Sequence, residues 1–297
     1  MRIGYACLAV GVPETEIRGC ILKNASDERL NNLIYHNLIS LENIIDYNIR
    51  NNILLFRISS DLIPFGSSPA NKLDWWKINA YHLNKIGRKI LDSGMRVSMH
   101  PGQYTVLNSP DEAVVSRAVC DLDYHAKVLD SLGVGPEHKI ILHIGGCYKD
   151  KQQSAKRFCE NYARLGEMVK QRLVIENDDK IYNIGEVLDI GTSLGIPVVF
   201  DNLHNAVNPC RDKEDEKYWI NKCSLTWQES DGGQKIHYSQ QDPLKKPGAH
   251  SERINVTEFL NFCKGLGRND LDIMLEVKDK NLSALKCIHA CTNSQII

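Results

Sequence analysis

Residues 95–112 read M-R-V-S-M-H-P-G-Q-Y-T-V-L-N-S-P-D-E, and this stretch holds one complete passage from a strand to a helix. The run M-R-V-S-M predicts a short strand that ends at His100. Ser109 is expected to cap the next helix, with Pro110 at the first helical position, where its missing N–H does no harm, and Glu112 at the third. A strand that leads through a polar loop into a helix is the repeating unit of α/β folds.

The same passage recurs along the whole chain. Short apolar runs, most of them rich in β-branched residues, predict eight strands, over residues 2–9, 53–59, 95–100, 139–145, 172–177, 197–202, 234–239 and 272–278. Helical spacing of apolar residues predicts helices between them, over residues 27–50, 72–92, 110–132, 151–170, 183–194, 213–222, 255–264 and 281–291. Ser26 or Asp27 is expected to cap the first helix. Three glycines stand where helices should end: Gly94, Gly133 and Gly195.

Eight strands alternating with eight helices over 297 residues predict an α/β protein of the (β/α)8 TIM-barrel class. We expect one domain, residues 1–297, with the active site at the C-terminal ends of the strands. A doubly wound sheet is the competing fold. It usually carries a glycine-rich phosphate loop after the first strand, and Y-A-C-L-A-V-G-V-P at 5–13 does not match G-x-G-x-x-G.

Composition limits the class of protein further. Apolar residues make up 42% and charged residues 25%, and the net charge of −1 gives no general attraction to nucleic acid or membrane, so a DNA-binding surface has to be local. The 10 cysteines contain no C-x-x-C pair, which predicts reduced thiols in a cytoplasmic protein. Cys287 and Cys291 flank His289 on the last predicted helix. We interpret these two cysteines as small buried hydrophobes rather than as a zinc site.

Reactive side chains gather at the ends of the predicted strands. Five of the 10 histidines lie there, where about two are expected by chance: His100, His143, His204, His237 and His250. Three carboxylates share these positions: Glu176, Asp201 and Glu276. Lys235 lies two residues before His237 and therefore shares its face of the strand.

This set of residue types is typical of a multi-metal site. Imidazoles with carboxylates suit Zn²⁺, Mn²⁺ or Fe²⁺ better than Ca²⁺, and eight ligands are enough for two or three ions. Closely spaced divalent ions stabilise both oxygens of a phosphoryl displacement. The residues alone thus predict a metal-dependent phosphoryl hydrolase on a barrel. A sugar isomerase or epimerase is the alternative, although such enzymes need a smaller set of Glu, Asp and His.

A series of motifs adds to this interpretation. It comprises R-I-G-Y at 2–5, F-R-I-S-S-D-L-I-P-F at 56–65, S-M-H-P-G-Q-Y at 98–104, L-H-I-G-G at 142–146, I-E-N-D at 175–178, F-D-N-L-H at 200–204, K-I-H-Y-S at 235–239 and L-E-V-K-D-K at 275–280. In this order and at these spacings, the series resembles the UV damage endonuclease family, which is related to endonuclease IV within the xylose-isomerase-like barrel group. The resemblance extends over nearly the whole chain.

The resemblance implies a DNA repair endonuclease that nicks the phosphodiester bond immediately 5′ to UV photolesions and leaves a 3′-hydroxyl. It implies a monomer that acts on double-stranded DNA and does not associate with a membrane. It also implies three bound divalent metal ions, with Mn²⁺ preferred over Zn²⁺ and Mg²⁺. The ligands that it implies are His100, His143, Glu176, Asp201, His204, His237, His250 and Glu276. Catalytic roles are expected for Lys235, His237 and Glu276.

The resemblance also implies that Lys235 is carboxylated on its ε-amine, which would give an anion where an ordinary ammonium group would be repelled by the metal ions. A phosphate contact or a surface lysine at the strand end is the alternative for Lys235. A non-catalytic, metal-dependent DNA-binding module is the third function that the sequence leaves open. Such a module would bind lesions without strand scission.

The resemblance places Gln103 and Tyr104 inside the duplex beside the lesion. A tyrosine ring can replace a lost stacking partner, which is worth about 1–3 kcal/mol per base, and a glutamine can bond to an orphaned base edge. Tyr5 is expected to line the lesion pocket, with a tyrosine of the barrel core as the alternative. Contacts with DNA phosphates are expected from Lys245, Lys246, Arg253 and Lys278.

Overall fold

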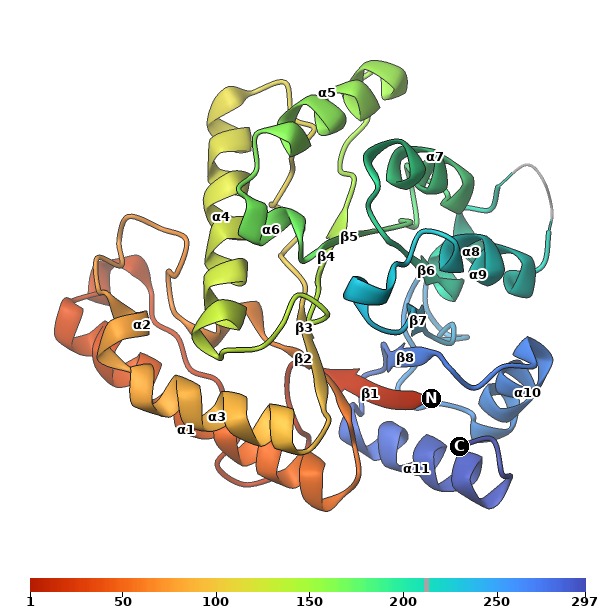
Figure 1. The fold of residues 1–297 in the computed structure, drawn as a ribbon, viewed down its shortest axis with the longest axis horizontal. Coiled ribbons are helices and arrows are strands. Elements are labelled where there is room, and N and C mark those ends of the chain that lie inside the picture. Colours follow the sequence, from red (N-terminus) through yellow and green to blue (C-terminus); the bar gives the residue numbers. More distant parts are fainter. Residues whose placement is uncertain (211–213) are drawn as a thin grey trace.

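A computed structural model describes residues 1–210 and 214–297. In these residues, parallel strands close into a barrel in chain order, with β8 paired to β1, and the predicted TIM barrel is confirmed (Figure 1). The strands are β1 (Arg2–Ala6), β2 (Leu55–Ile58), β3 (Arg96–Met99), β4 (Ile140–His143), β5 (Leu173–Glu176), β6 (Val198–Asp201), β7 (Lys235–Tyr238) and β8 (Asp272–Leu275).

Helices surround the barrel and connect its strands (Figure 1). They are α1 (Asp27–Arg50), α2 (Trp75–Ile78), α3 (Ala80–Asp92), α4 (Glu112–Ser131), α5 (Lys151–Ala163), α6 (Glu167–Lys170), α7 (Ile184–Leu194), α8 (Asn202–Val207), α9 (Glu216–Ser224), α10 (Val256–Leu266) and α11 (Asn281–Asn293). Short 3₁₀ helices are η1 (Leu22–Asn24), η2 (Ser60–Leu62) and η3 (Glu229–Asp231). None of the described helices is long and apolar enough to span a membrane.

Several element boundaries differ from the predicted ones. The first strand ends at Ala6 because Cys7 adopts a positive φ of 75°. The helix predicted over 72–92 is two helices, since the Asn79 side chain bonds to the carbonyl of Trp75 and ends α2. The helix predicted over 151–170 is likewise divided before Gly166. The first position of the helix predicted over 213–222 lies outside the described residues. The observed helix α9 begins at Glu216, with Asp215 as its N-cap.

The expected caps are partly correct. Ser26 caps α1 by accepting a hydrogen bond from the N–H of Arg29, and the three glycines after α3, α4 and α7 all have a positive φ, as predicted. The prediction that Ser109 caps α4 is wrong. Asp111 is the cap, because its carboxylate accepts a hydrogen bond from Ala113 N at 2.8 Å. Ser109 instead closes the turn before the helix by accepting from Asp111 N at 3.1 Å.

Side chains along each strand alternate between the helix layer and the barrel interior. Two small apolar clusters fill the interior, one of Ala6, Leu55 and Met274 and the other of Ile141, Val174 and Val199. Residues two positions further along these strands point the same way, so they lie one layer closer to the C-terminal mouth. These residues are Arg57, His143, Glu176, Asp201 and Glu276. The alternation of side chains along the strands therefore places these reactive side chains at the C-terminal mouth of the barrel.

The interior layer below the apolar clusters is charged. It contains Arg96, Lys139, Arg172 and Asp272, all buried. Arg96 Nη1 lies 2.8 Å from Asp272 Oδ2, and Lys139 Nζ lies 2.5 Å from Asp231 Oδ1. These ion pairs offset part of the cost of burying the charges.

Candidate metal centre and active site

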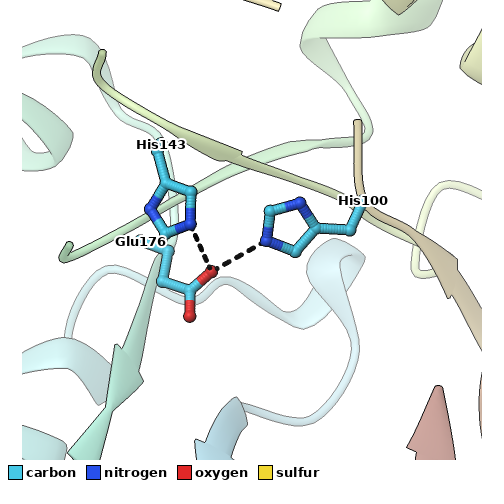
Figure 2. Close-up of side chains that lie close together, drawn as sticks. All are labelled: His100, His143 and Glu176. Carbon is cyan, nitrogen blue, oxygen red and sulfur yellow. Dashed lines mark hydrogen bonds and ion pairs between the residues drawn. The ribbon is translucent and has the colours of Figure 1, made fainter. Parts of the chain in front are cut away.

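Glu176, the last residue of β5, is the centre of the predicted ligand set. His100 Nε2 lies 3.1 Å and His143 Nε2 3.7 Å from Glu176 Oε2, and Figure 2 shows both rings directing a nitrogen at this oxygen. On the other side of the carboxylate, His237 Nδ1 lies 2.6 Å from Oε1. Residues from four different strands or strand ends thus meet at one carboxylate, as the sequence predicted.

Asp201 and His204 form the next wall of the site. Asp201 caps the short helix α8, and its Oδ1 accepts a hydrogen bond from His204 N at 2.7 Å. This turn directs the His204 ring back to the site, where Nδ1 lies 3.8 Å from both Glu176 Oε1 and Asp201 Oδ1. Asn177 fixes the arrangement, because its side chain pairs with the backbone N–H and carbonyl of Asp201. Its own carbonyl lies 2.9 Å from His204 Nδ1.

Glu276, directly after β8, joins the remaining ligands. Its carboxylate oxygens lie 3.4 Å from His237 Nδ1 and 3.7 Å from His250 Nε2. Arg57 Nη1 lies 2.5 Å from Glu276 Oε1. Arg57 was not among the predicted site residues. The signal for it was a single arginine inside the otherwise apolar run I-L-L-F-R-I at 53–58.

The electrostatics of the cluster depend on burial and on mutual contacts. Burial raises the pKa of Asp201 to about 6. Burial also lowers the pKa of His204, but Asp201, Glu176 and Glu276 outweigh it and raise that pKa to about 9. For Glu176, burial acts to raise the pKa, yet His237 and His143 hold it well below its ordinary value. Neighbouring imidazoles therefore hold Glu176 as an anion, and a bound cation can stabilise the same charge.

The residues present fit a divalent metal centre. Two groups of three have ligand atoms within 4.8 Å of one another, and both contain Glu176: His100 with His143 and Glu176, and Glu176 with Asp201 and His237. Among the described residues, three buried atoms of this set have no hydrogen-bond partner: His143 Nδ1, Asp201 Oδ2 and His237 Nε2. Unpartnered buried polar atoms are costly, so their concentration here points to a ligand. Imidazole and carboxylate donors suit Mn²⁺, Zn²⁺ or Fe²⁺.

Lys235 lies one layer below these ligands, two residues before His237 on the interior face of β7. It is fully buried, and its Nζ has no hydrogen-bond partner among the described residues. Burial and, next, the positive charge of Arg96 lower the pKa of Lys235 well below its ordinary value. The alternative of a surface lysine is thereby excluded.

Tyr5 is not at the mouth, and the expectation that it lines the lesion pocket is wrong. Its side chain is fully buried, and its hydroxyl donates to Asn48 Oδ1 of α1 at 2.8 Å. Its ring packs edge-on against Phe56. The strand alternation places Gly4 and Ala6 toward the interior, so Tyr5 faces the helix layer.

Gln103 and Tyr104 are exposed on the loop after β3, and the Tyr104 side chain is 83% accessible. The loop is anchored next to them, since Thr105 Oγ1 donates to Asp121 Oδ2 of α4 at 2.6 Å. At its start, Ser60 Oγ donates to the carbonyl of His100 at 2.8 Å. The exposed pair thus projects from a fixed base.

His125 of α4 supports the same loop, although it was not among the predicted site residues. Its Nε2 lies 2.9 Å from Ser60 Oγ, and it is almost fully buried. A histidine in the middle of a predicted helix carried no signal of this role. It connects α4, through Ser60, to the backbone of His100.

A cleft of about 1170 Å³ lies at the same end of the barrel as the proposed metal ligands, although none of these ligands lines it. The loops after β1, β2 and β3 form its walls, and Tyr104 and Thr105 border it. Leu8 and Ile17 contribute apolar surface from the loop after β1, while Arg117 contributes a positive charge from α4. The cleft therefore has the mixed lining typical of sites for sizeable ligands.

The basic residues predicted to contact DNA differ in their surroundings. Lys278 Nζ lies 2.5 Å and Lys245 Nζ 3.1 Å from Glu252 Oε1, so both are already ion-paired. Lys246 and Arg253 are exposed, and in the described part of the chain they form no ion pair. Cys287 and Cys291 are buried while His289 is exposed, and neither candidate metal group in the described residues includes a cysteine.

Comparison with known proteins supports the geometry. A family model described as UV-endonuclease UvdE matches residues 1–296. The chain is 45% identical over 295 residues to the UV DNA damage endonuclease of Clostridium perfringens, covering 98% of this chain and 70% of the relative. It is 34% identical over 270 residues to that of Bacillus cereus, covering 90% and 84%.

Solved structures give the same result. The crystal structure of SacUVDE superposes with a TM-score of 0.95 at 38% identity and covers all of both chains. A D-psicose 3-epimerase from Clostridium cellulolyticum has a TM-score of 0.57 at 13% identity, covering 98% of each chain. The second likeness shows the barrel fold alone.

Proposed function

The chain belongs to the UV-endonuclease UvdE family, whose activity is repair of UV-damaged DNA, and we propose that it nicks double-stranded DNA immediately 5′ to a photolesion and leaves a 3′-hydroxyl. The observation that carries the proposal is the convergence of five imidazoles and three carboxylates on one barrel mouth, with Tyr104 exposed on the loop that follows His100. In this proposal residues 1–297 form one catalytic domain that acts as a monomer in the cytoplasm. The ten free cysteines favour that reducing compartment.

We propose three divalent ions for the centre, Mn²⁺ in preference to Zn²⁺ or Mg²⁺. Two ligand groups that share Glu176, extended by His204 and His250, support more than one ion. The imidazole-rich donor set disfavours Mg²⁺, and the family resemblance favours Mn²⁺ over Zn²⁺. When bound, such ions supply Lewis-acid stabilisation and water activation for phosphodiester hydrolysis.

His237, Glu276 and Lys235 are the residues proposed to act at the reaction centre. His237 lies between Glu176 and Glu276, so it holds both carboxylates in position. Lys235, with its lowered pKa, is available as a neutral amine. Addition of this amine to CO₂ forms a C–N bond and releases a proton, and the resulting carbamate anion replaces a positive charge with a negative one beneath the ligands.

On the DNA, Gln103 and Tyr104 are proposed to enter the duplex while the lesion turns into the adjacent cleft. Their exposure and the anchored base of their loop support this role. Extrusion costs least where a lesion has already weakened stacking. Lys246 and Arg253 are proposed to contact phosphates directly. Lys245 and Lys278 are proposed to do so after exchanging their ion pairs with Glu252.

The test is incision of UV-irradiated supercoiled plasmid in the presence of Mn²⁺. The native protein should relax irradiated plasmid and leave unirradiated plasmid intact, and His237→Ala should be inactive with reduced metal content. His289→Ala, on the exposed face of α11, is the matched histidine control and should behave as the native protein. Absence of nicking by the native protein, or equal nicking by it and His237→Ala, would refute the proposal. Sequencing-gel analysis of an end-labelled duplex gives the position and ends of the nick.

Two alternatives predict different outcomes in the same assay. A ketose isomerase or epimerase would leave irradiated plasmid intact and convert a ketose. A DNA-binding module would retain damaged duplex on saturation with metal without cutting it. The likeness to the D-psicose 3-epimerase, at 13% identity, shows the fold alone and therefore does not support the first alternative.

A further inference from the structure

The two most exposed large apolar side chains in the described residues both belong to the barrel mouth. They are Leu244, 93% accessible, and Tyr104, 83% accessible. Leu244 lies in the loop after β7 and Tyr104 in the loop after β3. In a barrel of eight strands in chain order, β3 and β7 are four strands apart, so the two loops rise on opposite sides of the metal ligands. The role proposed for Tyr104 leaves Leu244 unexplained.

The loop that carries Leu244 is an ordered turn. Gln241 and His250 form an antiparallel bridge at its base, and Asp242 N donates to Ala249 O at 2.8 Å. The Gln241 side chain fills the turn by accepting from Gly248 N and donating to the carbonyls of Asp242 and Lys246. The backbone is thus held before any partner binds, so presenting Leu244 to a partner costs little conformational entropy.

The same loop is joined to the metal site. His250, at the base of the turn, lies 3.7 Å from Glu276. Lys278 N, two residues beyond Glu276, donates to the carbonyl of Ser251 at 3.2 Å. The position of Leu244 is therefore fixed relative to the place where the phosphodiester bond is cut.

The charges around Leu244 indicate the partner. Lys245 and Lys246 follow it directly, and Lys278 lies beside the base of the loop. The residues Asp242 and Glu252 neutralise part of this charge, which leaves an excess of basic groups around one protruding leucine. An exposed leucine followed directly by two lysines combines an apolar side chain that can wedge between bases with cations that can bind the adjacent phosphates.

We infer that Leu244 is an apolar wedge that inserts at a base step on the side of the lesion opposite Tyr104. This inference rests on the proposed function. Two wedges on opposite loops would hold the duplex open from both sides of the metal centre, with Lys245 and Lys246 on the adjacent phosphates. Insertion of an apolar side chain unstacks a step and bends the duplex, so it favours DNA that a lesion has already weakened.

The experiment compares Leu244→Ala with Leu225→Ala. Leu225 is 75% accessible, and the next residue, Thr226, bonds to Val198 N at the start of β6, so Leu225 lies at the opposite end of the barrel. Binding is measured by fluorescence anisotropy with a photolesion duplex whose scissile phosphate is a non-hydrolysable analogue. The same duplex carries 2-aminopurine next to the lesion to report unstacking.

Leu244→Ala should lose about tenfold in affinity for the damaged duplex and most of the 2-aminopurine signal on one side of the lesion. Its metal content should stay at the native level. Leu244→Met should keep both the affinity and the 2-aminopurine signal, and Leu225→Ala should match the native protein. Because Leu244 is almost fully exposed, these substitutions should leave the fold intact, and circular dichroism checks this.

The remaining outcomes distinguish failure of the proposed function from failure of the wedge role of Leu244. If the native protein neither binds nor nicks damaged duplex, the proposed function fails and the inference falls with it. If the native protein does both while Leu244→Ala binds equally well, the wedge alone is refuted. Loss of affinity with an unchanged 2-aminopurine signal places Leu244 outside the base stack, as a groove or protein contact, and also overturns the inference. Equal losses in Leu225→Ala would do the same.

Discussion

Arg57 and Glu276 meet inside the barrel mouth, with Nη1 of the guanidinium 2.5 Å from Oε1 of the carboxylate. The two residues are far apart in the chain and come from neighbouring parts of the barrel, β2 and the end of β8. Burial acts to raise the pKa of Glu276, but Arg57 and then His237 hold it below its ordinary value. Arg57 therefore keeps a proposed metal ligand anionic and oriented.

Replacing Arg57 by Gln should weaken the metal centre without removing a ligand. Partners that orient metal ligands typically contribute about 10- to 100-fold in metal affinity or activity. We expect a loss in this range for Mn²⁺ affinity, measured by equilibrium dialysis, with a parallel loss of nicking. Arg57→Lys should recover only part of the native Mn²⁺ affinity, because an ammonium group lacks the planar geometry of the guanidinium. Unchanged Mn²⁺ affinity in Arg57→Gln would show that the ion pair has no such role.

Tyr104→Ala should weaken lesion recognition and leave the metals in place. Loss of an aromatic stacking surface costs about 1–3 kcal/mol, which is roughly 5- to 150-fold in affinity. The measurement is anisotropy with damaged and undamaged duplexes, together with metal analysis of the purified variant. Tyr81→Ala is the control, since Tyr81 is 75% accessible on α3. Loss of metal from Tyr104→Ala, or full affinity for damaged DNA, would contradict the assigned role.

Lys235 should carry a carbamate when the protein is prepared with a divalent metal ion and ¹³C-bicarbonate. A neutral amine is the reactive form, and burial followed by Arg96 lowers the pKa of Lys235 toward that form. The expected observation is a carbamate carbon resonance that is absent from Lys235→Ala, measured with a diamagnetic divalent ion in place of Mn²⁺. Lys235→Ala should also bind less metal. Full metal loading of the native protein without this resonance would rule the modification out.

Most of the fold, and the gathering of the candidate ligands at one barrel mouth, was predictable from the sequence for a physical reason. Short apolar strands and amphipathic helices each carry their own periodicity, and a closed barrel leads the ends of all strands to one mouth. Positions such as Glu176 and Asp201 could therefore be assigned from their place in a strand. The direction of a side chain needs the phase of the alternation, which the short β1 did not reveal, and Tyr5 was assigned wrongly for that reason.

Contacts between distant segments were the other limit. Arg57 acts through Glu276 and His125 through Ser60, and in both cases the partner lies on a different strand or loop. Local pattern carries no information on such pairs. The cap of α4 moved from Ser109 to Asp111 because both residue types suit the position and only the path of the loop decides between them.

The stability of the protein should fall with acidification through His138, which lies below the barrel's apolar layer. His138 is buried, and its Nδ1 accepts a hydrogen bond from Val97 N at 3.0 Å. Burial, and then the positive charges of Arg96 and Arg172, lower its pKa from 6.5 to about 3. The unfolded chain therefore binds this proton more readily than the folded protein between these pH values. The stabilising contribution is complete above pH 6.5 and is lost as the pH falls toward 3.

Urea unfolding of the native protein and of His138→Gln tests this. The glutamine oxygen can accept the same hydrogen bond but does not titrate. Each unit of pKa difference corresponds to about 1.4 kcal/mol, so between pH 6.5 and 4.5 the native protein should lose roughly 2–3 kcal/mol more unfolding free energy than the variant. The exposed His289→Gln should follow the native curve. Parallel curves for the native protein and His138→Gln would mean that His138 takes up its proton in the folded protein as easily as in the unfolded chain.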